Sequence, residues 1–292
     1  MHILVVGGSG MLGSDVCAEV AGRGHVCEAP SSTELDITDP TSVAWVAGRM
    51  GRFDWCINCA GYTAVDKAES EPQAASEINA IGAAYLADAC GMAGIKLIHL
   101  STDFVFDGRA TEPYREDAPT HPLSVYGKTK RDGELSVRSA NPNASVVRAS
   151  WLYGPNGQSF PRTMIRAWEA GKSLRVVSDQ KGCPTYTGDL ARVLVDMAEA
   201  NAYPDVYHAC GPVATTWHGF AVATLEAWRH VVGTKRSVEV EAIPTEDYPT
   251  PATRPKYSVL ATSKVASLGI VPMRSLDCAL ARFVSRLAEI GA

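Results

Sequence analysis

Two residues one helical turn apart, Tyr126 and Lys130, have the types and the spacing needed to move a proton. If their segment is helical, both side chains project from the same face at positions i and i+4. A neighbouring ammonium favours the phenolate and is expected to lower the tyrosine pKa below its usual ~10. Such a phenol can donate a proton to the alkoxide that forms when a carbonyl group accepts a hydride.

An apolar run precedes this pair in the sequence. Residues 95–100 read as a buried parallel strand, and Ser101 and Thr102 follow at its carboxyl end. Open α/β sheets bind their ligands at that end of their strands. A bare Tyr-x-x-x-Lys is common by chance, so its meaning depends on whether the chain also builds a nucleotide site.

The N-terminal segment has the pattern of such a site. An apolar run at 2–6 leads into Gly7-Gly-Ser-Gly10-Met11-Leu12-Gly13, which opens a predicted helix ending near Arg23. Glycines at these positions allow a tight turn, close approach of the backbone to a pyrophosphate, and close packing of the helix. The helix N-terminus then presents free N–H groups and a partial positive charge to the phosphates. We therefore predict a dinucleotide site here.

The end of the second predicted strand bears on the choice of dinucleotide. It reads Pro30-Ser31-Ser32, without the Asp or Glu that would bind the ribose 2′-hydroxyl of NAD. The serine hydroxyls can donate to a 2′-phosphate, although no arginine accompanies them, so NADP(H) is favoured and NAD(H) stays open. Asp36 and Ile37 follow, either to hold the adenine edge or as part of a solvated turn.

The third predicted strand, 55–60, ends in Gly61-Tyr62-Thr63. Small residues at a strand tip let a cofactor lie against the backbone. The polar turn that follows, Asp66-Lys67-Ala-Glu69, is expected near the site because it comes directly after the strand tip. A long alanine-rich helix is predicted from Pro72 to Ala93, with Asn79 on its buried face.

The composition excludes several classes of partner. The chain has 292 residues, 46% of them hydrophobic, with a formal net charge of -5 and a pI near 5.8. This acidic balance argues against nucleic acid and against an anionic membrane as partner. No apolar run approaches the ~20 residues of a transmembrane helix, and no signal peptide pattern opens the sequence. We expect a cytoplasmic protein.

The eight cysteines fall mostly inside apolar runs, which suits buried reduced thiols better than a disulfide framework. Cys56 and Cys59 form a Cys-x-x-Cys, but they lie in a strand-like run rather than at a helix N-terminus. A zinc site would need a second pair or histidines at ligand spacing, and the sequence has neither. We interpret the pair as packing residues and assign no metal.

Strands and helices alternate up to Ser150, which predicts a doubly wound parallel Rossmann sheet in an α/β protein. The later, more irregular sequence predicts a smaller C-terminal substrate-binding domain. We expect an NAD(P)-binding domain at 1–150 and a mainly sugar-nucleotide-binding region at 151–292. Segments at about 187–212 are expected to return to the Rossmann sheet.

Four motifs together resemble dTDP-4-dehydrorhamnose reductases, a family of extended short-chain dehydrogenases/reductases. They are the glycine loop, Asn58-Cys-Ala-Gly-Tyr-Thr-Ala-Val-Asp-Lys-Ala-Glu69, Ser101-Thr-Asp-Phe-Val-Phe-Asp-Gly108 and Tyr126-Gly-Lys-Thr-Lys130. Arg148-Ala-Ser-Trp151, Pro184-Thr185 and Thr250-Pro-Ala-Thr-Arg-Pro255 extend the likeness over nearly the whole chain. The second and third motifs are much more specific than the glycines or the Tyr-x-x-x-Lys.

The resemblance implies a role for each matching residue. Tyr126 would donate the proton, Lys130 would lower its pKa and hold the nicotinamide ribose, and Thr102 would polarise the substrate carbonyl. Asp103 and Trp151 would contact the sugar nucleotide, although Trp151 could instead be a core aromatic. The implied contacts to the dinucleotide come from Gly7, Gly10, Met11, Leu12, Gly13, Asp36, Ile37, Gly61, Tyr62, Thr63, Tyr126 and Lys130. The implied reaction is NAD(P)H-dependent reduction of the C4 keto group of dTDP-4-dehydro-β-L-rhamnose.

Departures from the family pattern leave alternatives open. Phe104 stands where tyrosine is usual, and Pro30 stands where some members carry a cofactor-reading acid. A reductase of another nucleotide-linked 4-keto-6-deoxy sugar is the nearest rival. A dehydratase is disfavoured because such enzymes follow the active-site Thr with Asp-Glu, whereas Phe104 follows Asp103 here. A non-catalytic NADP-binding regulatory subunit would have been favoured by loss of Tyr126 or Lys130. The resemblance also leaves a homodimer open.

Overall fold

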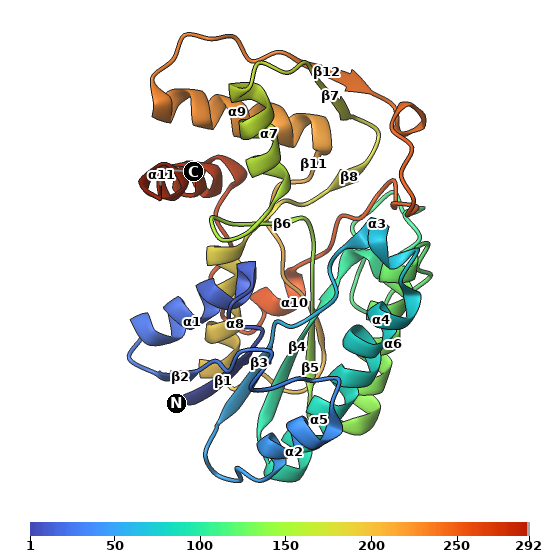
Figure 1. The fold of residues 1–292 in the computed structure, drawn as a ribbon, viewed down its shortest axis with the longest axis vertical. Helices are drawn as coiled ribbons and strands as arrows, with labels where there is room; N and C mark the ends of the chain where they lie inside the picture. Colours follow the sequence, from blue (N-terminus) through green and yellow to red (C-terminus); the bar gives the residue numbers. More distant parts are fainter. Residues whose placement is uncertain (291–292) are drawn as a thin grey trace.

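Six parallel strands form one sheet at the centre of the computed structural model, which describes residues 1–290 (Figure 1). The strands are β1 (His2–Val6), β2 (Val26–Glu28), β3 (Trp55–Asn58), β4 (Lys96–Thr102), β5 (Ser145–Ala149) and β10 (Val206–His208). They are ordered β10-β5-β4-β3-β1-β2, which confirms the predicted doubly wound α/β sheet. The order reverses between β1 and β3, and ligands bind at the carboxyl ends of strands at such a reversal.

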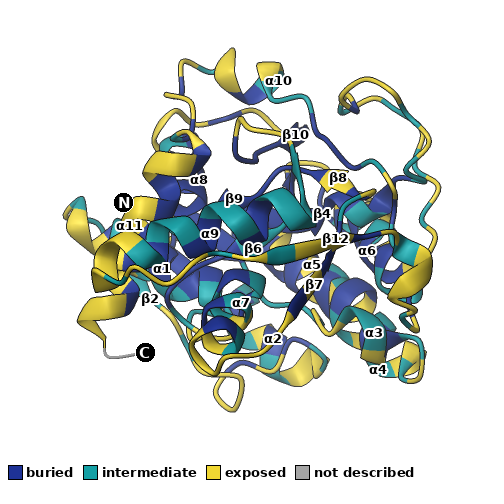
Figure 2. Cartoon of the chain, turned by 90° about the horizontal axis from the view of Figure 1, so that it is seen from above, coloured by how far each residue is buried: buried dark blue, intermediate teal, exposed yellow. Residues whose placement is uncertain are grey.

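Helices cover both faces of the sheet because its strands carry apolar side chains on both sides. In β1, Ile3 and Val5 pack against α1 and α8, whereas Leu4 and Val6 pack against α2 and α5. One face is covered by α1 (Met11–Gly22) and α8 (Thr187–Glu199), the other by α2 (Pro40–Ala47), α5 (Ala83–Ala93) and α6 (Val125–Ala140). Viewed from above, buried and intermediate residues occupy the centre of the molecule, and exposed residues lie mainly in its outer loops (Figure 2).

The helix predicted from Pro72 to Ala93 contains an irregularity that the sequence analysis did not foresee. It consists of α4 (Pro72–Ser76), a π-helical turn (Glu77–Gly82) and α5. Asn79 lies in this turn, where its side chain bonds the backbone of Tyr62 in both directions, at 2.8 and 3.2 Å. π-Helical turns occur often at functional sites. Here the turn is connected through Asn79 to the residues that follow β3.

Residues after β5 build a smaller, aromatic-rich group that lies above the sheet in Figure 1. Its helices are α7 (Phe160–Glu169), α9 (Trp217–Val232) and α11 (Leu276–Glu289). Its short strands are β6 (Leu152–Tyr153), β7 (Leu174–Val177), β8 (Lys181–Gly182), β9 (Thr185–Tyr186), β11 (Thr215–Thr216) and β12 (Val240–Ile243). Trp168, Phe220, Trp228 and Phe283 are the large side chains of its core.

The chain crosses between the two groups more than once. After β9 it returns to the sheet, where α8 packs on α1 and β10 pairs with β5. The short α10 (Ser263–Ala266) then packs beside β10 before the chain reaches α11. Among residues 1–290, no helix has both the length and the apolar character needed to cross a membrane.

Candidate functional site

Thr102 ends β4 and starts the 3-10 helix Asp103–Val105, so the strand's carboxyl end turns sharply at this residue. The Thr102 hydroxyl accepts a hydrogen bond from the backbone N–H of Phe104 at 3.2 Å and bonds the Asp103 carboxylate at 3.1 Å. The Thr102 side chain also lies close enough to the Tyr126 phenol to lower the pKa of that phenol. The hydroxyl is therefore fixed at the strand tip by contacts from three directions.

Tyr126 is the second residue of α6. The N-terminus of that helix is capped by one hydroxyl group and one carboxylate. The Ser124 side chain accepts from the N–H of Gly127 at 3.1 Å, the usual N-cap contact. The Glu69 carboxylate accepts from the N–H of Val125 at 2.8 Å. The helix then places Lys130 one turn beyond Tyr126, which confirms the predicted i, i+4 arrangement.

The electrostatics of Tyr126 differ from the sequence prediction. Burial raises the pKa of the phenol to about 12, the bond from Thr102 works against this, and the Asp103 charge adds to it. The predicted lowering by Lys130 is absent among the interactions of residues 1–290, because the Lys130 ammonium donates to the carbonyl of Leu100 at 2.6 Å. At neutral pH the phenol is therefore protonated, which is the state a proton donor needs.

Lys130 is buried against β4, and burial lowers the pKa of its ammonium to about 8, against the opposing charges of Glu134 and Cys59. Glu134, one turn further along α6, forms a bidentate ion pair with Arg148 of β5 at 2.8 and 2.7 Å. Ser101 donates to the same carboxylate at 2.5 Å. Buried hydrogen bonds and an ion pair at Glu134 thus connect α6 to both β4 and β5.

The glycine loop has the shape predicted for a pyrophosphate site. Gly7 has φ +77°, and a Cβ there would lie 2.7 Å from the backbone nitrogen of Ala60 at the tip of β3. A Cβ at Gly13 would lie 2.1 Å from the carbonyl oxygen of Gly7. Within residues 1–290, neither a side-chain cap at Gly10 nor an acidic residue in the first turn competes for the amides at the start of α1. These amides fit the phosphates of a dinucleotide.

The tip of β3 connects the cofactor side to the catalytic helix. A Cβ at Gly61 would lie 3.3 Å from the Asn79 side-chain oxygen and 3.6 Å from the Lys130 ammonium, so Gly61 lies directly between them. Asn79 also donates to the Thr129 hydroxyl of α6 at 3.0 Å. Tyr62 is held by Asn79, and Thr63 next to it is exposed. Predicted cofactor residues and predicted catalytic residues therefore meet at this point.

The predicted adenine-side residues lie in a turn after β2. The exposed Asp36 carboxylate accepts from the N–H and hydroxyl of Thr38, at 2.9 and 2.7 Å. Ile37 is buried in the core with α2 and α5. Ser31 donates its N–H and its hydroxyl to Glu34, both at 2.8 Å, so a carboxylate lies beside the predicted 2′-phosphate donors.

The two predicted substrate residues have interior positions. Asp103 is 1% exposed, one carboxylate oxygen accepts from the Thr102 hydroxyl at 3.1 Å, and the other lacks a partner among the described residues. Burial raises its pKa to about 7, against the bonds from Ser258 and Thr102. Trp151 has a left-handed φ of 48° and stacks on Trp217 with ring centroids 3.6 Å apart. It lies half-buried over Gly182, where a Cβ would clash with its ring.

Two adjoining cavities lie beside the aromatic-rich group, and their lining residues include none of the predicted site residues. The first, about 440 Å³, is lined by residues following β4 and by the 245–256 segment, and Leu123 places it beside the first turn of α6. The second, about 340 Å³, is lined by α7, β7 and the start of α9. They share Gln180, Tyr248, Thr250 and Arg254.

Comparison with known proteins places this chain in a family. Residues 1–289 match the sequence profile of the RmlD substrate binding domain. The chain belongs to this family. The dTDP-4-dehydrorhamnose reductase of Mycolicibacterium smegmatis is 39% identical over 293 residues, spanning 100% of this chain and 86% of that protein. The dTDP-4-keto-6-deoxy-D-glucose reductase of Streptomyces niveus is 37% identical over 278 residues, spanning 95% and 94%.

A solved structure of an RmlD-family protein agrees in fold as well as in sequence. The crystal structure of dTDP-4-dehydrorhamnose reductase from Bacillus anthracis in complex with NADP matches with a TM-score of 0.89 at 34% identity. The match covers 97% of this chain and 98% of that one. It supports both the sheet and the smaller group of helices as features shared within the RmlD family.

The sequence analysis missed residues of this RmlD-family chain that line the cavities. Trp217 and Arg175 belong to the second cavity, and Arg254 belongs to both. Trp217 was noticeable only as an aromatic at a helix start, and Arg254 only as part of the Thr250–Pro255 motif. Their segments are far apart in the sequence, so the sequence pattern had no means of bringing them together.

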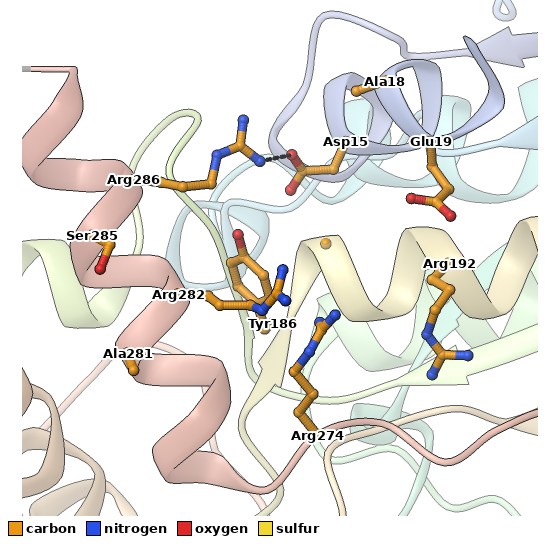
Figure 3. Close-up of a pocket in the computed structure, with 11 residues that line it drawn as sticks. Asp15, Ala18, Glu19, Tyr186, Arg192, Arg274, Ala281, Arg282, Ser285 and Arg286 are labelled. Atoms are coloured by element: carbon orange, nitrogen blue, oxygen red, sulfur yellow. Dashed lines mark ion pairs between the residues drawn. The ribbon is translucent and has the colours of Figure 1, made fainter. Parts of the chain in front are cut away.

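A separate cavity of about 500 Å³ lies where α1, α8 and α11 meet (Figure 3). Its arginines include Arg274, paired with the buried Asp189, and Arg286, 3.5 Å from the buried Asp15. Asp15 in turn accepts from Thr187 at 2.5 Å. This is an ion-pair network that joins three helices, and the predicted site residues lie outside it. Among residues 1–290, no group of three or more His, Cys, Asp or Glu side chains is arranged to hold a metal ion.

Proposed function

We propose that this RmlD-family protein reduces the C4 keto group of dTDP-4-dehydro-β-L-rhamnose to give dTDP-β-L-rhamnose, with NAD(P)H as reductant. The observation that carries the proposal is the meeting of Thr102, Tyr126 and Lys130 at the carboxyl end of β4, beside Gly61. The M. smegmatis relative named as this reductase, identical at 39% of positions over the whole chain, supports it.

Each of the three residues has a proposed task. Thr102, whose hydroxyl donates to Asp103 before substrate binds, turns that donor to the O4 carbonyl oxygen and so favours the charge that develops there. Tyr126, protonated at neutral pH, passes its proton to O4 as the alkoxide forms. Lys130, whose ammonium donates to the Leu100 carbonyl before substrate and coenzyme bind, is proposed to turn toward the phenolate that forms on Tyr126 and to hold the nicotinamide ribose. Bound NADPH supplies the hydride that adds to C4.

The coenzyme is proposed to lie along Gly7–Gly13 and Gly61–Thr63, with its adenine end near Asp36 and Ile37. The uncapped start of α1 and the tight fit of Gly7 and Gly13 support the phosphate position. The B. anthracis relative in complex with NADP supports NADP(H) as the favoured coenzyme. NAD(H) stays open, because Glu34 faces Ser31 where a 2′-phosphate would need donors.

The nucleotide half of the substrate is proposed to occupy the two adjoining cavities. Trp217 offers a face on which a thymine ring can stack. Arg175, paired with Glu241, and Arg254, paired with Asp66, are proposed to contact the diphosphate. Asp103 and Trp151 are proposed to position residues that contact the substrate. Asp103 acts through its hydrogen bond with Thr102, and Trp151 acts through its stacking on Trp217. The predicted division into residues 1–150 and 151–292 then assigns the coenzyme to the first part, while residues of both parts line the cavities proposed for the sugar nucleotide.

A second candidate is reduction of another nucleotide-linked 4-keto-6-deoxy sugar. It is favoured by the S. niveus relative, which is 37% identical and is named for a dTDP-4-keto-6-deoxy-D-glucose. A non-catalytic NADP-binding regulatory subunit is the remaining alternative.

A cytoplasmic location is proposed from the eight cysteines, all free thiols, which suit a reducing compartment. The homodimer stays a prediction.

The test is oxidation of NADPH and of NADH in the presence of enzymatically prepared dTDP-4-dehydro-L-rhamnose, followed by reduced-nicotinamide absorbance. The wild type is expected to turn over, and Tyr126→Phe is expected to lose ~10²–10⁴-fold in kcat while still binding coenzyme. Rapid turnover only with another 4-keto sugar would select the second candidate. Tight coenzyme binding without any turnover would favour the regulatory subunit.

A further inference from the structure

The one-turn helix α3 (Val65–Ala68) lies at a junction of three parts of the molecule (Figure 1). It follows directly from the β3 tip, Gly61–Thr63, where the coenzyme is proposed to lie. Its motif, Asp66-Lys67-Ala-Glu69, supplies two carboxylates that bond to segments far away in the sequence. These bonds give the motif a task that the proposed reaction mechanism does not yet use.

Asp66 holds the loop that lines the substrate cavities. One of its carboxylate oxygens accepts from Arg254 at 2.8 Å, and the other accepts from the N–H of Ala252 at 3.2 Å. Arg254 also donates to the Thr250 hydroxyl, and both of these residues line both cavities. Burial pulls the pKa of Asp66 upward, but the bonds from Arg254 and Ala252 outweigh it and lower the pKa overall. Asp66 is therefore ionised whenever the loop is in place.

Glu69 holds the first turn of α6. Its carboxylate accepts from the N–H of Val125 at 2.8 Å, and Val125 immediately precedes Tyr126. A negative charge at a helix N-terminus also interacts favourably with the helix dipole. The backbone that carries Tyr126 is thus fixed from outside its own helix, in addition to the cap from Ser124.

We propose that Asp66 and Glu69 are positioning residues that act on two different steps of one reaction. Asp66 sets the 250–254 loop for binding of the sugar nucleotide, and Glu69 sets the Tyr126 phenol for proton donation. Because both lie on one helical turn, α3 couples the substrate loop to the catalytic helix at the coenzyme's edge. The inference rests on the proposed function for its kinetic meaning.

The kinetic test compares Asp66→Ala with Glu69→Ala in the full-length protein. Asp66→Ala is expected to raise KM for the dTDP-sugar about tenfold with little change in kcat, the effect of one lost charge-assisted hydrogen bond. Glu69→Ala is expected to lower kcat about tenfold with little change in KM. Glu69→Gln should recover most of kcat, because its amide oxygen can still accept from Val125. Lys67→Gln is the matched control. Within residues 1–290 this exposed side chain of the same turn forms an ion pair with Glu71 alone, so the change should leave both parameters near wild type.

Two further readouts separate this inference from the proposed function. Amide hydrogen exchange should accelerate in the first turn of α6 in Glu69→Ala, and in residues 250–254 in Asp66→Ala, in each case without the other. Calorimetry with dTDP should show about tenfold weaker binding in Asp66→Ala only. The inference would be overturned if both alanine variants showed the same fall in kcat and the same rise in KM. It would also be overturned if amide exchange accelerated equally in both segments in each variant. A wild type inactive on every keto sugar would overturn the proposed function, and exchange and dTDP binding would then decide the inference.

Discussion

The Lys130 ammonium has a charge that changes with pH just above neutrality. Burial lowers its pKa from 10.5 to about 8, so it loses its proton as the pH rises through about 8. Without that charge, the phenolate left by Tyr126 lacks a stabilising partner. We therefore expect kcat/KM to fall above pH ~8. The measurement is a pH profile with the dTDP-sugar at low concentration.

The same shift has the opposite effect on folding, which supplies the control. The unfolded chain binds the Lys130 proton more tightly than the folded chain between pH 8 and 10.5. Since stability rises with pH wherever the unfolded state binds more protons, this residue favours the folded state as the pH rises across that range. Loss of activity above pH ~8 should therefore precede unfolding. A profile that stays flat to pH 10 would contradict the role given to Lys130.

Glu34 is the residue expected to limit the use of NADPH. Its carboxylate takes both donors of Ser31, and these bonds lower the pKa of Glu34, so it is charged at neutral pH. A 2′-phosphate placed there would meet like charge. Glu34→Gln is expected to lower KM for NADPH several-fold and leave KM for NADH unchanged. Glu28→Gln, at the nearby end of β2 and paired with Arg52, is the control. An equal change for both coenzymes would place the 2′-phosphate elsewhere.

At the scale of elements, the join between α6 and the sheet depends on one buried ion pair. The Arg148 and Glu134 side chains are 5% and 6% exposed, and the pair is bidentate. Removing one partner leaves the other charge buried and uncompensated, which costs ~3–5 kcal/mol. Glu134→Gln is therefore expected to lower the free energy of unfolding by roughly that amount, measured by denaturant titration.

The pair Arg229–Glu226 on α9, with side chains 31% and 41% exposed, is a suitable comparison for this prediction. Exposed helix pairs contribute only ~0.3–0.5 kcal/mol, so Glu226→Gln should leave stability almost unchanged. Similar losses in the two variants would show that the Glu134 pair is not the anchor of α6. A large loss of stability confined to Glu134→Gln would show that the ion pair beneath the predicted catalytic residues also stabilises the fold.

Elements with strong local patterns were predictable from the sequence, and those set by distant contacts were not. The glycine loop, β4 and the helical phase of Tyr126 and Lys130 each follow from a pattern within about ten residues. The π-helical turn at Asn79 was missed because an extra residue in a helical turn leaves alanine-rich sequence looking uniformly helical. The raised Tyr126 pKa was missed because burial depends on the whole site.

At the scale of the whole molecule, the substrate cavities depend on chain segments that meet only after folding. Four segments line the cavities: the loop that follows β4, the strand β7, the start of α9, and residues 245–256. Repeated crossings between the sheet and the aromatic-rich group bring these segments together. A ligand that fills the cavities and contacts both groups should therefore stabilise the molecule as a unit.

This argument gives a prediction for ligand-dependent stability. dTDP at about 100 times its Kd should stabilise the folded protein by ~2.7 kcal/mol, which for a chain of this size is a rise in Tm of roughly 5 °C. Trp217→Ala removes the proposed stacking face and should abolish most of the rise with dTDP, while the rise with NADPH persists because the glycine loop is intact. Trp45→Ala, on α2 and outside both cavities, should keep both responses. If Trp217→Ala keeps its full response to dTDP, the base binds elsewhere, and the cavity beside the first turn of α6 would have to hold the whole nucleotide sugar.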